Sequence, residues 1–393
     1  MNYIFYFFIF LIIVYLILFT YVKIKYHFWN IQPVFHYYNI FYWILSDRII
    51  NEDLPRINKY CNMREIKTFK YDELTSLDKQ FIINFLKTYF LRTHEVNYLP
   101  SIESFESNFE NHVYPSFISI YSTDMNLFDY KNNHIINTQE IIGFMTTRPL
   151  YITLYDKSFP LYYVDYLCVH NLYRKKGIAP QVIQTHELNQ RHNNKEIKVS
   201  LFKREGEING IVPLSFYYTY GYKKIDVYKI TDASVEIVKI NKSSVHYFLD
   251  FFKNYKKMFD CVITPHLSNL ISLIESKTVF VYLLKQNTNI LSCYIFKNTD
   301  TLYNNKKSIE CISSINTIKH DTTKLFYRGF TQAYYNISKS LNSKILLIED
   351  TSHNNEIIKH ITTKEPFFIS PTAFFLYNYA SKTVKHNKFI YIY

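Results

Sequence analysis

Residues 163–181 read YVDYLCVHNLYRKKGIAPQ, and this stretch decides the fold that we expect. The apolar run that ends at Val169 predicts a strand, and residues 177–192 predict a helix with Pro180 in its first turn. The turn between them carries three basic and two small residues: Arg174, Lys175, Lys176, Gly177 and Ala179. A helix amino terminus directs backbone N–H groups at one point, and small residues let a phosphate approach the backbone. The stretch therefore predicts a pyrophosphate site, with an ordinary basic turn before a helix as the alternative.

Strands and helices alternate on both sides of this stretch. Around it we expect strands at 141–145, 150–155, 161–169 and 199–202, then a short helix at 213–220 and a strand at 225–230. The later part repeats this order, with strands at 279–284, 290–296 and 309–315, a helix at 322–341, and strands at 345–348 and 373–377. The repetition predicts an internal duplication whose joint lies near residues 228–238.

The amino-terminal residues 4–22 are almost wholly apolar and long enough to cross the hydrocarbon core of a membrane as a helix. Lys23 and Lys25 follow the run directly, which favours a retained anchor over a cleaved signal peptide. Because these charges follow the span, we expect a single-pass membrane protein whose bulk faces the cytosol. A second aromatic stretch, residues 35–45, is too short to span, so it would lie at the membrane interface or pack on the domain.

The formal net charge is +12. Such a surplus would attract CoA phosphates, acidic lipids or nucleic acid, but no dense basic block is present, which favours a dispersed basic surface. Nucleic-acid-binding motifs are absent from the sequence, so we expect no nucleic-acid partner. The five cysteines form no C-x-x-C pair and the histidines form no H-E-x-x-H motif, so we expect neither a disulfide framework nor a metal.

Several short motifs resemble one family. R-x-x-G-x-A after a strand resembles the acyl-CoA loop of the GNAT superfamily, and residues 216–222 resemble that superfamily's aromatic-x-x-x-G-aromatic segment. Four motifs resemble those of the N-myristoyltransferases, in the family's order: residues 28–34 (F-W-x-T-Q-P-V in the family), 142–144 (V-G-F-I), 165–170 (N-F-L-C-V-H) and 376–379 (L-Y-N-W). The resemblance implies an α/β fold: a tandem pair of GNAT-like acyltransferase units, each a mixed sheet flanked by helices. Together with the transmembrane helix expected above, this gives an anchor at 3–22, an acyl-CoA-binding half at 23–230 and a peptide-binding half at 231–393.

The resemblance also implies an activity, the transfer of a myristoyl group from myristoyl-CoA to the amine of an amino-terminal glycine in a protein or peptide. In this family the amine attacks the thioester directly, and backbone N–H groups, here those of Tyr166 and Leu167, stabilise the oxyanion. By resemblance, contacts with the acyl-CoA fall on His27, Phe28, Trp29, Tyr166, Leu167, Cys168, Val169, Arg174, Lys175, Lys176, Gly177, Ile178 and Ala179.

The family's catalytic base is the chain's own terminal carboxylate, and the resemblance assigns that role to Tyr393. A glycine α-ammonium has a pKa of about 7.7–8.0, so it must lose a proton before it attacks. Residues 389–393 alternate in a way that predicts a buried strand carrying the carboxylate inward, where burial would raise its pKa. A hydrophobic closing strand with an idle terminus is the alternative.

The chain also departs from the family's pattern. The family's acidic E-D-D-D stretch is replaced by residues 94–97 and its Y-T-A-G segment by residues 200–203, so the peptide preference stays open. Gly177 replaces a basic residue of the loop, and Lys176 would have to supply that phosphate contact. No R-x-x-G-x-A follows Ile315, so the second half is not expected to bind CoA. Members of the family are soluble, so the membrane span is a further departure.

Three other interpretations stay open. The chain could be a different CoA-dependent N-acyltransferase, which uses another acyl chain or another amine. It could be an inactive membrane-bound scaffold that keeps only the fold. Finally, Cys168 and His170 lie two apart on the expected strand, so they could face one side and act as a thiol nucleophile with its base.

Overall fold

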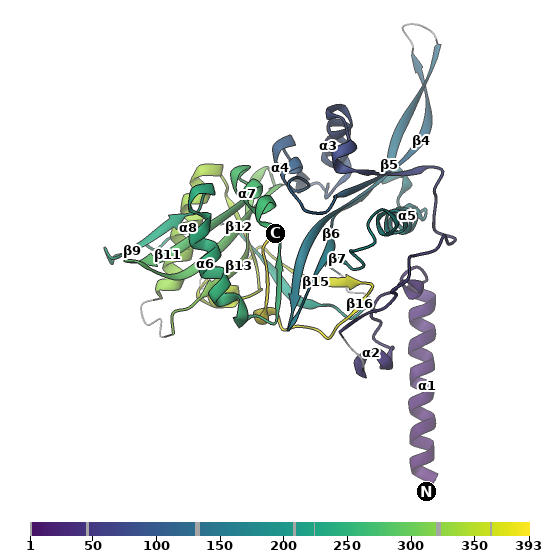
Figure 1. The fold of residues 1–393 in the computed structure, drawn as a ribbon, viewed down its shortest axis with the longest axis horizontal. Coiled ribbons are helices and arrows are strands. Elements are labelled where there is room, and N and C mark those ends of the chain that lie inside the picture. Colours follow the sequence, from purple (N-terminus) through teal and green to yellow (C-terminus); the bar gives the residue numbers. More distant parts are fainter. Residues whose placement is uncertain are drawn as a thin grey trace.

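The computed structural model describes residues 2–44, 47–129, 134–206, 210–223, 225–319, 324–361 and 364–393. One large mixed sheet contains strands from both halves of the chain, and a long helix, α1 (Asn2–Lys25), extends away from it (Figure 1). The expected α/β fold with a central sheet flanked by helices is therefore confirmed, and so is the apolar amino-terminal helix. Length and hydropathy would allow α1 to cross a membrane.

The first half contains four further helices and eight strands in the described residues. The helices are α2 (Ile40–Ile44), α3 (Ser76–Tyr89), α4 (Ile102–Ser107) and α5 (Ile178–Asn193). The strands are β1 (Arg48–Ile49), β2 (Ile66–Lys70), β3 (Val96–Tyr98), β4 (Phe117–Asp129), β5 (His134–Leu154), β6 (Lys157–Val169), β7 (Ser200–Glu205) and β8 (Ser215–Tyr222).

The second half contains four helices and nine strands in the described residues. The helices are α6 (Val245–Tyr255), α7 (Leu267–Glu275), α8 (Leu325–Leu341) and α9 (Asn354–His360). The strands are β9 (Val235–Lys239), β10 (Cys261–Thr264), β11 (Val279–Gln286), β12 (Asn289–Tyr303), β13 (Lys306–Asn316), β14 (Ile345–Glu349), β15 (Phe368–Tyr377), β16 (Tyr379–Ala380) and β17 (Phe389–Tyr391).

The sheet interleaves strands from both halves. Its order is β17-β10-β5-β6-β7-β15-β8-β14-β13-β12-β11-β9, with β4 also on β5, β2 on β4, and β3 on β12. Thus β15 lies between β7 and β8, and β10 pairs with β5. The largest hydrophobic core likewise joins side chains of both halves, from Leu150 on β5 to Tyr391 on β17. The expected boundary at residue 230 falls between β8 and β9, in a stretch without strands or helices, and the division into halves stays a prediction.

Several expected elements differ from those in the structure. Residues 141–145 and 150–155 belong to one strand, β5. Pro149 does not interrupt it, because β4 pairs with β5 only as far as Thr147 and β10 only from Tyr151, so no neighbour on that side needs the missing N–H.

The helix expected at 213–220 is wrong. Residues 215–222 form β8, which pairs with β15 and β14, and its buried side chains alternate with less buried ones as a strand requires. Tyr- and Phe-rich segments favour strands, and here that preference prevails. The strand expected at 225–230 is absent from those residues, where only Ile225 is buried. The helix expected at 322–341 is found as α8, and residues 322–323 lie outside the described part of the chain.

Candidate active site

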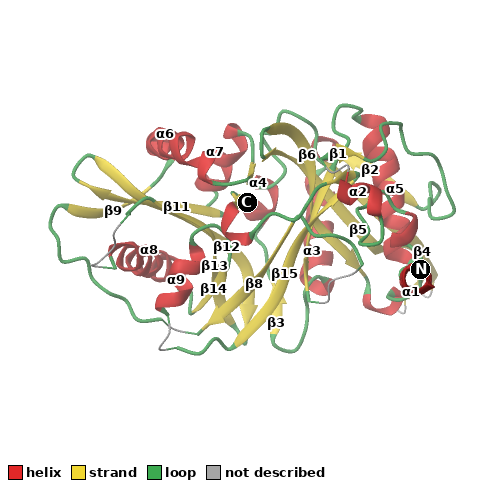
Figure 2. Ribbon diagram, turned by 90° about the horizontal axis from the view of Figure 1, so that it is seen from below, coloured by secondary structure: helices red, strands yellow, loops and turns green. Residues whose placement is uncertain are grey.

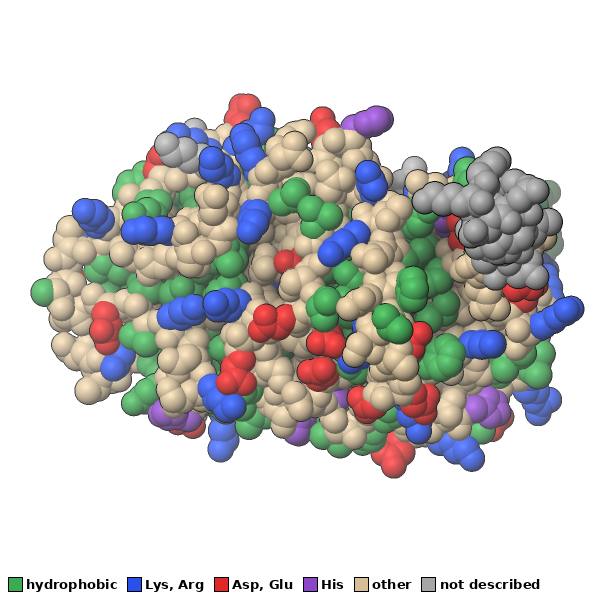
Figure 3. All heavy atoms as spheres, turned by 90° about the horizontal axis from the view of Figure 1, so that it is seen from above, with side chains coloured by type: hydrophobic (Ala, Val, Ile, Leu, Met, Phe, Trp, Pro, Cys, Tyr) green, Lys and Arg blue, Asp and Glu red, His purple; other side chains and the backbone are tan. Residues whose placement is uncertain are grey.

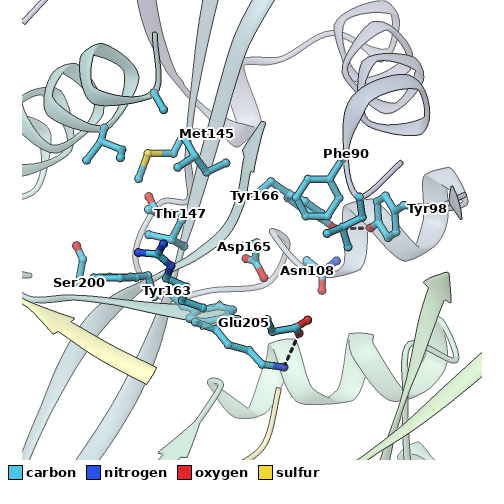
Figure 4. Close-up of a pocket in the computed structure, with 18 of the residues that line it drawn as sticks. Phe90, Tyr98, Asn108, Met145, Thr147, Tyr163, Asp165, Tyr166, Ser200 and Glu205 are labelled. Carbon is cyan, nitrogen blue, oxygen red and sulfur yellow. Dashed lines mark hydrogen bonds and ion pairs between the residues drawn. The ribbon is translucent and has the colours of Figure 1, made fainter. Parts of the chain in front are cut away.

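A cavity of about 920 Å³ lies between the two halves. Its walls come from the segment after α1, from β5 and β6, from the start of α5, from β7 and from β12 and β13. The carboxyl-terminal residue Tyr393 also lines it, and two views place the terminus in the middle of the molecule (Figures 1 and 2). The cavity thus brings the predicted oxyanion strand and the predicted base into one space, and Figure 4 shows Asp165 and Tyr166 in its wall.

The strand that carries Tyr166 and Leu167 is irregular at this point. Met145 pairs with Leu167 and Thr147 pairs with Val164, so Asp165 and Tyr166 together stand opposite Thr146 alone. This arrangement is a β-bulge, a feature that often re-aims groups at active sites. The N–H of Tyr166 donates to Thr146 Oγ1 at 3.3 Å, a long hydrogen bond that a stronger acceptor could replace. The bulge was not predicted from the sequence.

The side chain of Tyr166 is committed to packing. Its ring lies among Phe90, Phe105 and Phe109, and its hydroxyl is 2.6 Å from that of Tyr98 (Figure 4). Burial raises the pKa of Tyr166 well above its ordinary value, so the phenol stays protonated. Of Tyr166, only the backbone is therefore suited to contact a reacting thioester.

Cys168 is a poor candidate for a nucleophile. Its thiol is buried beside Phe144, and burial raises the pKa of Cys168 to about 12. His170 is engaged elsewhere, because its Nδ1 accepts the N–H of Leu172 and its Nε2 lies 3.4 Å from Glu140. The thiol interpretation left open by the sequence thus lacks a thiolate and a free base.

The loop between β6 and α5 turns through two left-handed residues, Lys175 (φ 63°) and Gly177 (φ 78°). No side chain caps α5, so its first backbone N–H groups are available to an anion. Lys175 and Lys176 are exposed. Arg174 has a structural role that was not expected from the sequence. Its Nε donates to Val169 O at 3.2 Å and its Nη2 donates to Tyr89 O at 3.0 Å, and these hydrogen bonds hold the loop against β6 and α3.

Helix α5 lies close against β5 because of Gly143. A Cβ at that position would lie 3.0 Å from both Ile178 and Val182, so any other residue would push these side chains away from β5. Gly143 therefore sets the position of the α5 amino terminus. Residues 142–144, which resemble the family's V-G-F-I motif, thus contact the helix that follows the loop.

Two motifs at opposite ends of the chain meet beside the cavity. Tyr377 donates through its hydroxyl to Gln32 Oε1 at 2.7 Å, Val34 bridges to Tyr377, and the N–H of Asn378 donates to Pro33 O at 2.7 Å. Trp29 stacks on Phe202 of β7 with ring centroids 5.4 Å apart. The carboxyl-terminal L-Y-N-Y segment thus holds the segment that carries His27, Phe28 and Trp29 against the cavity.

The last residues form β17, which is parallel to β10, and Phe389 to Tyr393 are all buried. Ile392 donates its N–H to Ile263 O at 2.8 Å, and the hydroxyl of Ser313 donates to Tyr391 O at 2.9 Å. The terminus is therefore fixed by neighbours on two sides.

A buried ion pair lies beside the terminus. Arg148 is fully buried, its Nε is 2.7 Å from Asp165 Oδ2, and its Nη1 donates to the backbone oxygen of Tyr393 at 3.3 Å. The guanidinium also stacks on the Tyr393 ring at 4.5 Å, while Lys297 Nζ lies 3.8 Å from the same ring. Burial raises the pKa of Asp165, although Arg148 opposes that rise.

Sequence reasoning missed this pair. The only signal was Asp165 in place of the family's Asn, and nothing in the sequence connected Asp165 with Arg148.

A second buried charged group was also missed. Lys203 on β7 contacts Glu349 and lies 3.8 Å from Glu310, and Tyr217 donates its hydroxyl to Glu349 at 2.9 Å. Tyr391, two residues before the terminus, donates its hydroxyl to the same carboxylate. Burial raises the pKa of Glu349, and the nearby Glu310 adds to the rise. This group links the terminal strand to the wall of the cavity.

The predicted site residues fall into two sets. Those that line the cavity are His27, Phe28, Trp29, Tyr166, Leu167, Ala179 and Tyr393. Those that lie at the end of β6, on the adjoining loop or at the first residue of α5 are Cys168, Val169, Arg174, Lys175, Lys176, Gly177 and Ile178. Among the described residues, no group of His, Cys, Asp and Glu could hold a metal ion.

Comparisons with known proteins support the family indicated by the motifs. Residues 128–212 match the family model described as Myristoyl-CoA:protein N-myristoyltransferase, N-terminal domain. The fold is similar to a crystal structure of Saccharomyces cerevisiae N-myristoyltransferase with bound myristoyl-CoA, with a TM-score of 0.70 and 15% identity over 91% of this chain and 94% of that chain. A second structure of the yeast enzyme gives a TM-score of 0.69 and 16% identity over 91% and 89% of the two chains.

A search of curated proteins finds no match. The resemblance to the N-myristoyltransferases is nevertheless confirmed, in fold over most of the chain and in sequence over residues 128–212. The chain thus has the fold of the N-myristoyltransferases, and part of its first half matches the model of that family's amino-terminal domain.

Proposed function

We propose that the chain transfers a myristoyl group from myristoyl-CoA to the α-amine of an amino-terminal glycine in a protein. The observation that carries this proposal is the β-bulge at Asp165 and Tyr166, which opens onto the same cavity as Tyr393. Both yeast structures named above hold myristoyl-CoA, which supports an acyl-CoA as the donor here.

The donor's phosphates would bind at the amino terminus of α5. The uncapped N–H groups of that helix and the exposed Lys175 and Lys176 suit a pyrophosphate. The pantetheine would then run along β6, and the thioester would reach the bulge. There the N–H groups of Tyr166 and Leu167 would receive the oxyanion, because donors aimed at developing charge stabilise the transition state more than the ground state.

The α-carboxylate of Tyr393 would act as the base. It takes one proton from the glycine ammonium, and the free amine then forms a C–N bond with the thioester carbon. The tetrahedral oxyanion collapses, the C–S bond breaks, and the CoA thiolate leaves with the second proton of the amine. This role requires a free carboxylate at Tyr393, which an intact-mass measurement checks.

Helix α1 would anchor the enzyme in a membrane with its catalytic part on the cytosolic side. An 18-residue stretch of α1 has a mean hydropathy of 2.6 and is not buried, and Lys23 and Lys25 mark the end nearer the domain. Carbonate extraction should leave the chain in the membrane pellet, and protease added outside intact cytosol-side-out vesicles should digest the catalytic part. Protection of that part without detergent would contradict this topology.

Mass spectrometry of the untagged full chain in detergent tests the reaction. Myristoyl-CoA and acetyl-CoA are each offered with a Gly-peptide and with matched peptides that begin with Ala or with N-acetylated Gly. We expect one myristoyl group on the free Gly-peptide alone. Transfer of acetyl, or transfer to a lysine, would indicate a different CoA-dependent N-acyltransferase. Binding of acyl-CoA without any transfer would indicate an inactive scaffold.

A further inference from the structure

The segment that follows the anchor exposes an apolar surface. We define the apolar seat as Tyr37 together with Ile40, Phe41, Trp43 and Ile44 of the short helix α2. Their side chains are 40–71% exposed, although all five are large and apolar. The inner side of α2 packs on the domain, because Trp43 and Tyr42 both contact Phe35, with ring centroids 4.9 and 5.6 Å apart.

One contact fixes the position along α1 of Tyr38, which stands between Tyr37 and Ile40 of the apolar seat. The ring of Tyr38 meets that of Phe19 on α1 edge to face at 5.1 Å. Tyr38 is itself held by the domain, since it stacks on the buried His36 at 5.0 Å and donates its hydroxyl to Asn30 at 2.8 Å. In Figure 1, α2 lies below the rest of the first half, on the side toward which α1 extends.

This geometry gives a depth. Phe19 lies four residues before Lys23, which is about 6 Å at the helical rise of roughly 1.5 Å per residue. When Lys23 and Lys25 lie at the headgroups, Tyr38, which stands between Tyr37 and Ile40 of the apolar seat, therefore lies at the boundary of headgroups and acyl chains. Apolar faces of interfacial helices occupy about that depth, roughly 5–10 Å, and Trp and Tyr favour the same zone.

We propose that the apolar seat inserts into the bilayer interface and orients the catalytic half on the membrane. This inference rests on the proposed anchoring by α1 and goes beyond it, because a single helix alone would leave the domain free to tilt. Lys23 and Lys25 in the last turn of α1 supply positive charge suited to anionic headgroups. The opposite face of the molecule instead intersperses Lys and Arg with Asp and Glu (Figure 3).

The orientation has a consequence for the donor. His27, Phe28 and Trp29, which line the cavity, begin only two residues after α1 ends at Lys25. The proposed acyl-CoA site is thus held next to the surface where long-chain acyl-CoA partitions. A donor with a long acyl chain would reach the cavity from the membrane side.

The two tryptophans of the chain provide the test. Trp43 belongs to the apolar seat, whereas Trp29 is stacked against Phe202 beside the cavity. The full chain is placed in vesicles of phosphatidylcholine with a minor share of phosphatidylglycerol, and flotation first shows that it is bound. In Trp29→Phe, lipids brominated near the glycerol end should quench Trp43 severalfold more than they quench Trp29 in the matched Trp43→Phe variant.

The outcomes separate the inference from the functions on which it rests. Equal quenching of the two tryptophans in protein that floats would overturn the apolar seat and leave the anchor standing. Failure to float would overturn both, while the acyl-transfer assay would remain an independent test of the enzyme. In the Trp29→Phe background, Phe41→Glu with Ile44→Glu should weaken the quenching, and the exposed Tyr247→Glu on α6 should leave it unchanged. Quenching that survives the paired change would also count against the apolar seat.

Discussion

Arg148 and Asp165 form a buried ion pair, so removing either residue leaves the other without its partner. Burying a charge without its partner is costly, and breaking a buried pair costs about 3–5 kcal/mol. We expect Arg148→Met to lower the free energy of unfolding in urea by about that amount, because the buried Asp165 would lose its counter-ion and would have to stay unpaired or take up a proton. The double variant Arg148→Met with Asp165→Asn should recover most of the loss, since no unpaired charge remains.

The same double variant separates packing from positioning. Arg148 Nη1 contacts the oxygen of Tyr393, so its loss should let the carboxylate shift even when the fold is stable. A misplacement of about 1 Å can cost about 10²-fold in rate, and we expect a decrease of that order in kcat with an unchanged affinity for acyl-CoA. Wild-type kcat in the stable double variant would show that the pair serves the fold alone.

Gly177 is needed for two reasons: its backbone is left-handed, and its missing side chain leaves the α5 amino terminus accessible. Its φ of 78° costs an L-residue about 1–2 kcal/mol, and a β-branched side chain there would also stand in front of the α5 amino terminus. Gly177→Val should therefore weaken acyl-CoA binding in calorimetry. Gly206 is a matched control, since it has a φ of 85° and equally open surroundings but lies after β7. If Gly206→Val lowered the acyl-CoA affinity as much as Gly177→Val, the loop before α5 would not be the binding site.

At the scale of elements, β17 is the strand through which the carboxyl terminus reaches the cavity. A short extension after Tyr393 should displace the carboxylate, and loss of general base catalysis typically lowers kcat by roughly 10²–10⁴-fold. Acyl-CoA binding should persist, because the loop before α5 is untouched. The same extension placed before Met1 serves as the control. Full acyl transfer by the carboxyl-terminally extended enzyme would rule out the carboxylate as the base.

The sequence predicted those elements whose pattern is local. The strand before Val169, the helix at 177–192 and the inward course of residues 389–393 each follow from periodicity or from turn residues, and each is present. By contrast, β8 was expected as a helix, because its strand character depends on pairing with β14 and β15, which lie far along the chain. Pro149 within β5 is tolerated only because of a gap between two neighbouring strands, which no local pattern records.

The candidate site shows the same division. Motifs predicted Tyr166, Leu167 and the loop at Gly177, because their spacing is contained in one stretch of sequence. The bulge, the Arg148–Asp165 pair and the group around Lys203 depend on how strands register and on which side chains meet across the sheet. Such contacts join residues that are 17 to 146 positions apart, as with Asp165 and Arg148 or Glu349 and Lys203. A single sequence does not display them.

At the scale of the whole molecule, the two halves share one sheet. β15 from the second half separates β7 from β8, and β10 extends the pairing of β5. Neither half can complete its own sheet, because each lacks strands that the other supplies. The cavity depends on this exchange, since Tyr393 reaches it on a strand that pairs with β10.

This interleaving predicts how the chain responds to division between β8 and β9. A protease site inserted within residues 225–234, which contain neither strand nor helix, should allow cleavage of the folded protein without loss of its structure. The nicked fragments should stay together through gel filtration in detergent and keep acyl-CoA binding, because twelve consecutive strands of the sheet remain paired across both pieces.

The same two fragments expressed separately should instead lack cooperative unfolding, since exposed strand edges and half of the shared core would face water. Insertion of the same site into β15 is the control, and cleavage there should abolish binding. A first fragment that folds alone and binds acyl-CoA would show that the halves are independent domains.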